Sequence, residues 1–150
     1  MEYIKSKIRD VIDFPTKGVI FKDLTTAFKD PRALHIIGWD LSQLYRDKGV
    51  TKVVGIESRG FIGGSILAFE LGAGFVPARK PGKLPADTVS QTYDKEYGTD
   101  TIEMHKDAIT SDDIVVIMTT YSPPAARWLR LTNLSRVSIL RKSTSISSSR

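Results

Sequence analysis

Cysteine is absent from the 150-residue sequence, and histidine occurs only twice. Without thiols the chain can form neither a disulfide nor a thiolate metal site, which fits a reducing compartment such as the cytoplasm. His35 and His105 are far apart and lack the spacing of metal ligands. The sequence therefore predicts no metal ion held by protein side chains.

Long apolar runs are also missing, and none approaches the roughly 20 residues that a membrane-spanning helix requires. The N-terminal stretch MEYIKSKIRDVIDF interleaves charged and apolar residues, so it does not have the uninterrupted apolar core of a secretory signal. Hydrophobic residues make up 41% of the chain, which is typical of a globular protein with one core. We therefore expect a cytoplasmic protein without membrane contact.

The net charge of +5 raises the question of a nucleic-acid partner. All 17 acidic residues lie at or before Asp113, together with 16 of the 22 basic ones, so this part is nearly neutral. The excess positive charge belongs to the segment from Arg127 to Arg150. That segment lacks sustained periodicity and ends in a Ser/Arg-rich stretch, so we expect poor order there and no nucleic-acid binding.

Hydrophobic periodicity predicts helices and strands in alternation. An amphipathic helix is expected near Tyr3 to Val11, followed by an irregular loop around Pro15 and Gly18. Asp30 is positioned to cap a helix that starts at Pro31. The core face of this helix should comprise Ala33, Leu34, Ile37, Leu41, Leu44 and Tyr45.

Three short apolar runs, KVVGI, GFVPARK and DDIVVIM, predict buried strands, and ESRGFIGGSILAFELG predicts a helix that ends at Gly72. Strands that alternate with helices favour an α/β fold with a parallel twisted sheet flanked by helices, whose ligands bind at the carboxyl ends of the strands. The stretch from Lys80 to His105 is rich in Pro, Gly and charge and predicts a flexible hairpin flap.

Two basic turns follow neighbouring predicted strands. Ser58, Arg59 and Gly60 come after KVVGI and Glu57, at the start of a helix whose N-terminus favours anions. Arg79, Lys80 and Lys83 come after the next strand. Together they predict a site for a polyanion, with an ordinary turn and a solvated charge run as the alternatives.

Aromatic and flap residues add two weaker indications. Phe21 and Lys22 lie in the predicted loop, where the ring could stack on a flat ligand or be part of the core. Glu96 and Tyr97 lie on the flap, where they could close over a ligand or face solvent.

Taken in order, DFPTKGVIFKDLT, VVGIESRGFIGG, GFVPARKPGKLPADT and YDKEYGTDTIEMHKDAI resemble the motifs of adenine phosphoribosyltransferases, from about Ile12 to Ile117. The resemblance implies the type I phosphoribosyltransferase fold and a pentosyltransferase of purine salvage. Such enzymes transfer 5-phosphoribosyl from phosphoribosyl pyrophosphate (PRPP) to adenine and release AMP and pyrophosphate. They are cytoplasmic homodimers and bind Mg²⁺ through PRPP.

The resemblance also implies roles for residues that match the motifs. Ile20, Phe21 and Lys22 would bind adenine, and Glu96 and Tyr97 would close on the reaction centre as the catalytic flap pair. The pyrophosphate would be bound by Ser58, Arg59, Gly60, Arg79, Lys80 and Lys83.

The family's ribose-phosphate motif, two adjacent acids followed by leucines and ATGGT, is missing after the IVVI strand. In its place stand Thr119, Thr120, Tyr121, Ser122, Pro123, Pro124, Ala125, Ala126 and Arg127. When codons for Met118 to Arg127 are read from the last base of the methionine codon, they can spell Asp-Asp-Leu-Leu-Ala-Thr-Gly-Gly-Thr. We infer a one-base loss at or just before codon 118.

The sequence thus predicts a phosphoribosyltransferase-like domain over residues 1–118 and an aberrant, poorly ordered tail over residues 119–150. Without the ribose-phosphate motif, little or no activity is expected, and the strand before it should be left partly bare. The alternatives are a non-catalytic adenine- or pyrophosphate-binding fragment, a subunit-interaction fragment, a basic nucleic-acid binder acting through the tail, and a related regulatory protein.

Overall fold

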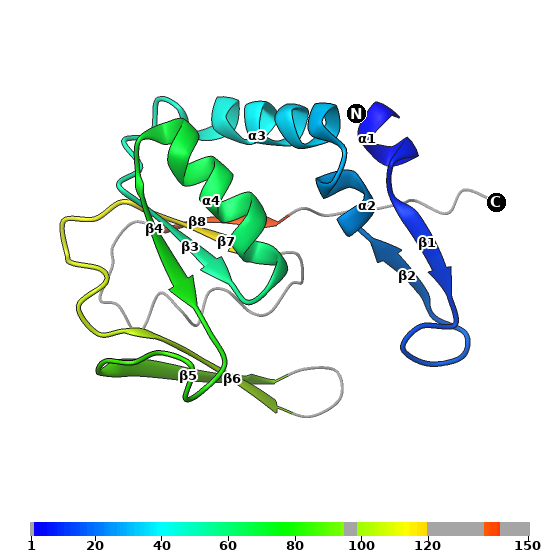
Figure 1. The fold of residues 1–150 in the computed structure, drawn as a ribbon. Coiled ribbons are helices and arrows are strands. Elements are labelled where there is room, and N and C mark those ends of the chain that lie inside the picture. Colours follow the sequence, from blue (N-terminus) through cyan, green and yellow to red (C-terminus); the bar gives the residue numbers. More distant parts are fainter. Residues whose placement is uncertain (1, 95–98, 120–136, 142–150) are drawn as a thin grey trace. The chain divides into compact units, whose positions relative to one another are not determined.

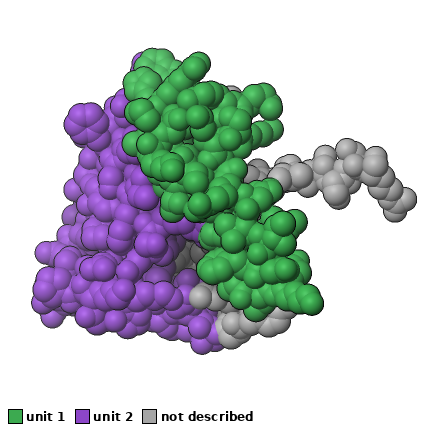
Figure 2. Space-filling model, turned by 45° about the vertical axis from the view of Figure 1, so that its right-hand side comes forward, with its two compact units in different colours: residues 1–44 green, residues 45–150 purple. Residues whose placement is uncertain are grey.

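The computed structural model describes residues 2–94 and 99–119 and the backbone of residues 137–141. The chain divides into two compact units, residues 1–44 and residues 45–150, which Figure 2 distinguishes by colour.

The first unit contains three helices and one antiparallel hairpin. The helices are α1 (Glu2–Ser6), α2 (Thr25–Phe28) and α3 (Pro31–Tyr45). The strands are β1 (Arg9–Ile12) and β2 (Ile20–Asp23). The last residue of α3, Tyr45, belongs to the second unit. The predicted cap of α3 is confirmed, because the Ala33 N–H donates a 2.9 Å hydrogen bond to Asp30 Oδ1. Lys7 adds an ion pair to the same carboxylate at 3.0 Å.

The helix predicted near Tyr3 to Val11 is wrong in its second half, and so is the irregular loop around Phe21. Arg9–Ile12 instead pairs with Ile20–Asp23, and two of the four cross-strand pairs carry opposite charges. Arg9 contacts Asp23 at 2.5 Å, and Lys22 contacts Asp10 at 2.6 Å. These pairs favour the hairpin over a continued helix.

The predicted core face of α3 is only partly correct. Ala33, Ile37 and Tyr45 are buried, but Leu44 is 54% exposed. Ser42 is buried instead, where its hydroxyl donates to the Trp39 carbonyl at 2.9 Å. The buried face of α3 is therefore slightly rotated from the face that the apolar residues indicate.

The second unit is built on a parallel sheet in the order β4-β3-β7-β8. Its strands are β3 (Lys52–Ile56), β4 (Gly74–Ala78), β7 (Val115–Thr119) and β8 (Val137–Arg141). The three predicted strands and their parallel pairing are confirmed. Helix α4 (Arg59–Leu71) ends as predicted at Gly72, which has the left-handed conformation of a helix C-cap.

Alternate residues of each strand face opposite sides of the sheet. On one side lies α4, which approaches the strands closely because Gly55 and Gly60 carry no side chains. On the other side lies the antiparallel hairpin of β5 (Thr88–Asp94) and β6 (Thr99–His105), as Figure 1 shows. The sheet therefore separates two apolar layers.

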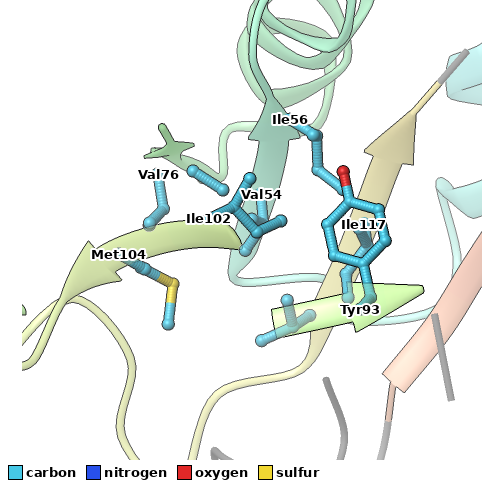
Figure 3. Packing of buried hydrophobic residues seen from close by; sticks show 9 residues of the cluster. Val54, Ile56, Val76, Tyr93, Ile102, Met104 and Ile117 are labelled. Carbon is cyan, nitrogen blue, oxygen red and sulfur yellow. The ribbon is translucent and has the colours of Figure 1, made fainter. Parts of the chain in front are cut away.

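The hairpin side of the sheet forms the main hydrophobic cluster. Tyr93, Ile102 and Met104 of the hairpin pack against Val54, Ile56, Val76, Ala78, Val115 and Ile117 of the sheet (Figure 3). The predicted hairpin is confirmed, and its inner face belongs to the core. This anchors the part of the flap that the structure describes.

The tail predicted to be poorly ordered lies almost entirely outside the described residues. Its described parts are Thr119, the last residue of β7, and the backbone of β8, which pairs in parallel with β7. The β7 residues from Val115 to Thr119 are all buried, so β7 is a central strand and is not left bare at an edge. The prediction that the rest of the tail lacks order stays a prediction.

Candidate anion-binding site

The two basic turns meet at one edge of the parallel sheet, as the sequence predicts. Ile56 and Ala78, the last residues of β3 and β4, are register partners, so the residues after them emerge side by side. Glu57 follows β3, and its peptide bond to Ser58 is cis. Arg79 and Lys80 follow β4 and lie directly opposite Glu57.

The Glu57 carboxylate holds the basic cluster, by which we mean Arg79, Lys80 and Lys83. Lys83 Nζ lies 2.9 Å and Arg79 Nη2 3.4 Å from Oε1, and the Lys80 backbone N–H donates to Oε2 at 3.0 Å. The Glu57 side chain is only 14% exposed. Three donors from one loop therefore converge on one partly buried acceptor.

These contacts change the acidity of Glu57. The hydrogen bond from the Lys80 backbone, followed by that from the Lys83 ammonium and by Arg79, lowers the pKa of Glu57 from 4.5 to about 2. The carboxylate therefore stays charged to well below neutral pH, and its charge keeps the Arg79 guanidinium and the Lys83 ammonium beside it.

The hairpin completes the site from the other side. Arg79 exchanges two backbone hydrogen bonds with Glu103 of β6, at 2.8 and 2.7 Å. The Lys80 ammonium pairs with Asp100, the second residue of β6. Arg79 also donates through Nη1 to the Lys83 carbonyl at 3.3 Å. The cluster is thus held between the end of β3 and the hairpin.

The remaining predicted residues of this site begin α4. Ser58 precedes the helix and makes no side-chain capping bond, and Arg59 is its first residue. Gly60 lies inside the first turn, where a Cβ would come within 2.5 Å of the Met118 carbonyl oxygen of β7. The structure therefore gives Gly60 a packing role, while anion binding by Ser58, Arg59 and Gly60 stays a prediction.

The predicted adenine residues belong to the first unit. Ile20, Phe21 and Lys22 lie on β2, where Ile20 is 59% exposed. The Phe21 ring packs edge-on against Phe14, with 5.2 Å between their centroids. Glu96 and Tyr97 lie outside the described residues.

Asp100 was not indicated by the sequence patterns. Its Oδ2 accepts a 3.3 Å hydrogen bond from the Tyr93 hydroxyl, in addition to the Lys80 contact at Oδ1. Alternation along β6 places Asp100 on the same face as the buried Ile102 and Met104. That alternation is the one sequence signal that could have marked this acid as turned inward.

Within the described parts of the chain, no group of three or more metal-ligating side chains is present, and no helix is long and apolar enough to cross a membrane. The site presents the cationic side chains of Arg79, Lys80 and Lys83, each paired with a carboxylate of Glu57 or Asp100. Its chemistry suits a ligand with several anionic oxygens.

Comparison with known proteins decides the family. The adenine phosphoribosyltransferase of Phocaeicola vulgatus is 60% identical over 116 residues, which cover 77% of this chain and 67% of the relative. The crystal structure of the Thermoanaerobacter pseudethanolicus adenine phosphoribosyltransferase superposes with a TM-score of 0.81 at 39% identity, covering 93% of this chain and 86% of that one. This chain belongs to the adenine phosphoribosyltransferase family.

A further adenine phosphoribosyltransferase structure, that of Giardia lamblia in complex with 9-deazaadenine, gives a TM-score of 0.82 at 38% identity and covers 91% of this chain and 80% of that one. No protein-family model matches the chain. The chain spans about two thirds of the length of the curated relatives, 67% in one adenine phosphoribosyltransferase and 65% in another. The fold and family predicted from the sequence are confirmed.

Glu57 should make the stability of this adenine phosphoribosyltransferase homologue depend on pH. Its folded-state pKa is lowered to about 2, so its contribution is present above pH 4.5 and is lost as the pH falls through about 2. Glu57→Gln should raise the unfolding equilibrium constant at pH 7 at least about tenfold and should flatten its pH dependence in that window. Urea unfolding at pH 7, 4 and 2.5 measures both effects.

The matched control for Glu57 is Glu70→Gln, which removes the same charge from an exposed position of α4. The control should keep the pH dependence of the parent. Asp23 has its own pKa lowered to about 2, chiefly by the Thr25 hydroxyl, so some dependence should persist in both variants. Parallel pH profiles for Glu57→Gln and the parent would contradict the assignment.

Proposed function

We propose that the chain binds the substrates of adenine phosphoribosyl transfer but catalyses the reaction poorly as it is written. In that reaction the bond from C1′ of PRPP to pyrophosphate breaks, N9 of adenine bonds to C1′, and the N9 proton leaves. The products are AMP and pyrophosphate. The single observation that carries the proposal is the convergence of Arg79, Lys80 and Lys83 at the carboxyl edge of the sheet.

The basic cluster would hold the pyrophosphate and stabilise the negative charge that grows on it as the bond to C1′ breaks. Arg59 would add a cation at the start of α4. Ile20, Phe21 and Lys22 would bind adenine, and Glu96 and Tyr97 would close over the reaction centre. A closed site excludes water from the developing oxocarbenium ion.

Magnesium fits this arrangement as a partner of the pyrophosphate. Glu57 and Asp100 already accept hydrogen bonds from cationic and backbone groups, and no metal-binding cluster occurs within the described residues. Mg²⁺ would therefore be held through PRPP or pyrophosphate oxygens, where it neutralises charge. A cytoplasmic location and a homodimer belong to the same proposal.

Poor catalysis follows from what stands at the carboxyl end of β7. This strand is the neighbour of β3, so its end lies at the same edge of the sheet as Glu57. Thr119 stands there, buried and uncharged, where the family motif begins with a carboxylate. The curated relatives match over 115 to 118 residues, which agrees with a similarity that ends near Met118.

This chain should therefore bind pyrophosphate without catalysing the transfer. Titration calorimetry with inorganic pyrophosphate tests it, and we expect binding by the full chain. Lys83→Ala should weaken the affinity roughly tenfold, because a hydrogen bond to a charged group contributes about 1.5 to 3 kcal/mol.

The matched control is Lys106→Ala, an equal loss of charge in the exposed turn after β6, at the other end of that strand from Asp100. It should leave pyrophosphate affinity within about twofold of the parent. Equal weakening by both substitutions would show diffuse attraction to positive charge and would count against a defined site.

A further inference from the structure

Lys80 is held by two different carboxylates. Its backbone N–H donates to Glu57 at 3.0 Å, while its ammonium turns toward the hairpin and pairs with Asp100. Arg79 and Lys83 share the other oxygen of Glu57. Among the described residues, Lys80 is therefore the member of the basic cluster whose charged side chain pairs with the hairpin.

The Asp100 carboxylate is fixed more firmly than its partner. Its oxygens also accept hydrogen bonds from the Thr101 N–H at 3.1 Å and the Tyr93 hydroxyl at 3.3 Å. Tyr93 is 7% exposed and packs in the core. The Asp100 side chain is 14% exposed, whereas that of Lys80 is 42% exposed.

A ligand that recruits the Lys80 ammonium must therefore draw it away from a carboxylate that stays in place. The long lysine side chain can swing, but Asp100 is tied to the strand and to Tyr93. Resting on the proposed function, we propose that Asp100 competes with pyrophosphate for Lys80 and so sets the affinity of the anion site. Asp100 is thus an affinity-determining residue that acts through Lys80.

The test is calorimetric titration of the full chain with inorganic pyrophosphate at fixed ionic strength, comparing the parent with Asp100→Asn. Asparagine keeps the shape and can accept the Thr101 N–H bond through Oδ1, while its amide N–H₂ can donate to the Tyr93 hydroxyl oxygen. It loses the charge that holds Lys80. We expect pyrophosphate to bind about threefold to fivefold more tightly, the scale of one partly exposed ion pair. Asp100→Ser provides a second neutral variant if asparagine impairs folding.

Two further proteins separate competition from simple charge removal. In a Lys80→Met background, Asp100→Asn should leave the pyrophosphate affinity unchanged, because the ammonium group for which Asp100 and pyrophosphate compete is gone. Asp107→Asn removes an equal charge from the exposed turn after β6 and should also have no effect.

Unchanged or weaker binding by Asp100→Asn, with pyrophosphate still bound by the parent, would overturn the competition and leave the proposed function standing. Tightening that persists in the Lys80→Met background would overturn it as well, since Asp100 would then repel the anion directly. Absence of binding in the parent and in every Asp100 variant would instead reject the anion site itself.

Discussion

The chain as written is expected to convert adenine and PRPP to AMP at no measurable rate. Restoring one base at codon 118 should raise the rate of AMP formation at least about a thousandfold. The restored frame supplies two carboxylates for the ribose hydroxyls and loop amides for the 5-phosphate. Each hydrogen bond to a charged group contributes about 1.5 to 3 kcal/mol. Their joint loss weakens PRPP binding by at least about 4 kcal/mol, on the order of a thousandfold.

The measurement is conversion of labelled adenine, with PRPP affinity determined separately by calorimetry. Adenine affinity should be similar in the two proteins, because Ile20, Phe21 and Lys22 are unchanged. A matched control restores the frame but replaces both new aspartates by asparagine, and it should lose most of the recovered rate. Normal turnover by the chain as written would refute the assignment of the lost motif.

Gly60→Ala is expected to destabilise the second unit by about 2 to 4 kcal/mol, the range of severe overpacking in a core. A Cβ at this position would come within 2.5 Å of the Met118 carbonyl oxygen, and a backbone atom of a central strand cannot move aside cheaply. Helix α4 and β7 would have to separate. Urea unfolding monitored by circular dichroism should show the midpoint falling at constant slope.

Gly63→Ala is the matched control for this change, because it adds the same methyl group to the same helix. Its Cβ would meet the Met118 side chain at 3.5 Å, an ordinary contact. Alanine also favours helix by about 1 kcal/mol over glycine, so this variant should be as stable as the parent or slightly more so. Equal destabilisation by the two substitutions would show that the close approach of Gly60 to β7 is not the cause.

Much of the second unit could be predicted from the sequence because its elements are strongly patterned. The run KVVGI is short, apolar and rich in β-branched residues, which favours a buried strand, and the helix after it ends at a glycine in the left-handed conformation. The sheet edge follows from these elements, since parallel strands must end together. That Glu57 would pair with the basic cluster was not predicted, because the patterns indicated only that the two turns share an edge.

The first unit was harder to predict, for a physical reason. RDVI is four residues long, and so short a segment fits a helical face and a strand equally well. The choice is made by pairing with IFKD, where Arg9 meets Asp23 and Lys22 meets Asp10. Such pairing is a property of two segments together and leaves no mark in either one alone.

The role of Asp100 at the site was also hard to predict from the sequence. An aspartate between two threonines on a short strand looks like an ordinary solvent-facing residue. Its contact with Lys80 depends on how the hairpin lies against the sheet, which the packing of Ile102 and Met104 determines. Long-range packing of this kind sets the partner of a charged side chain without changing local sequence pattern.

The carboxylate of Glu57 has a consequence for the thermodynamics of association. It keeps one guanidinium and one ammonium group assembled before any anion arrives, so their rotational freedom is already restricted in the free protein. Immobilising such a side chain on binding ordinarily costs about 0.5 to 1.5 kcal/mol. Pyrophosphate should therefore meet a preorganised surface and bind with a small entropic penalty from the side chains that it contacts.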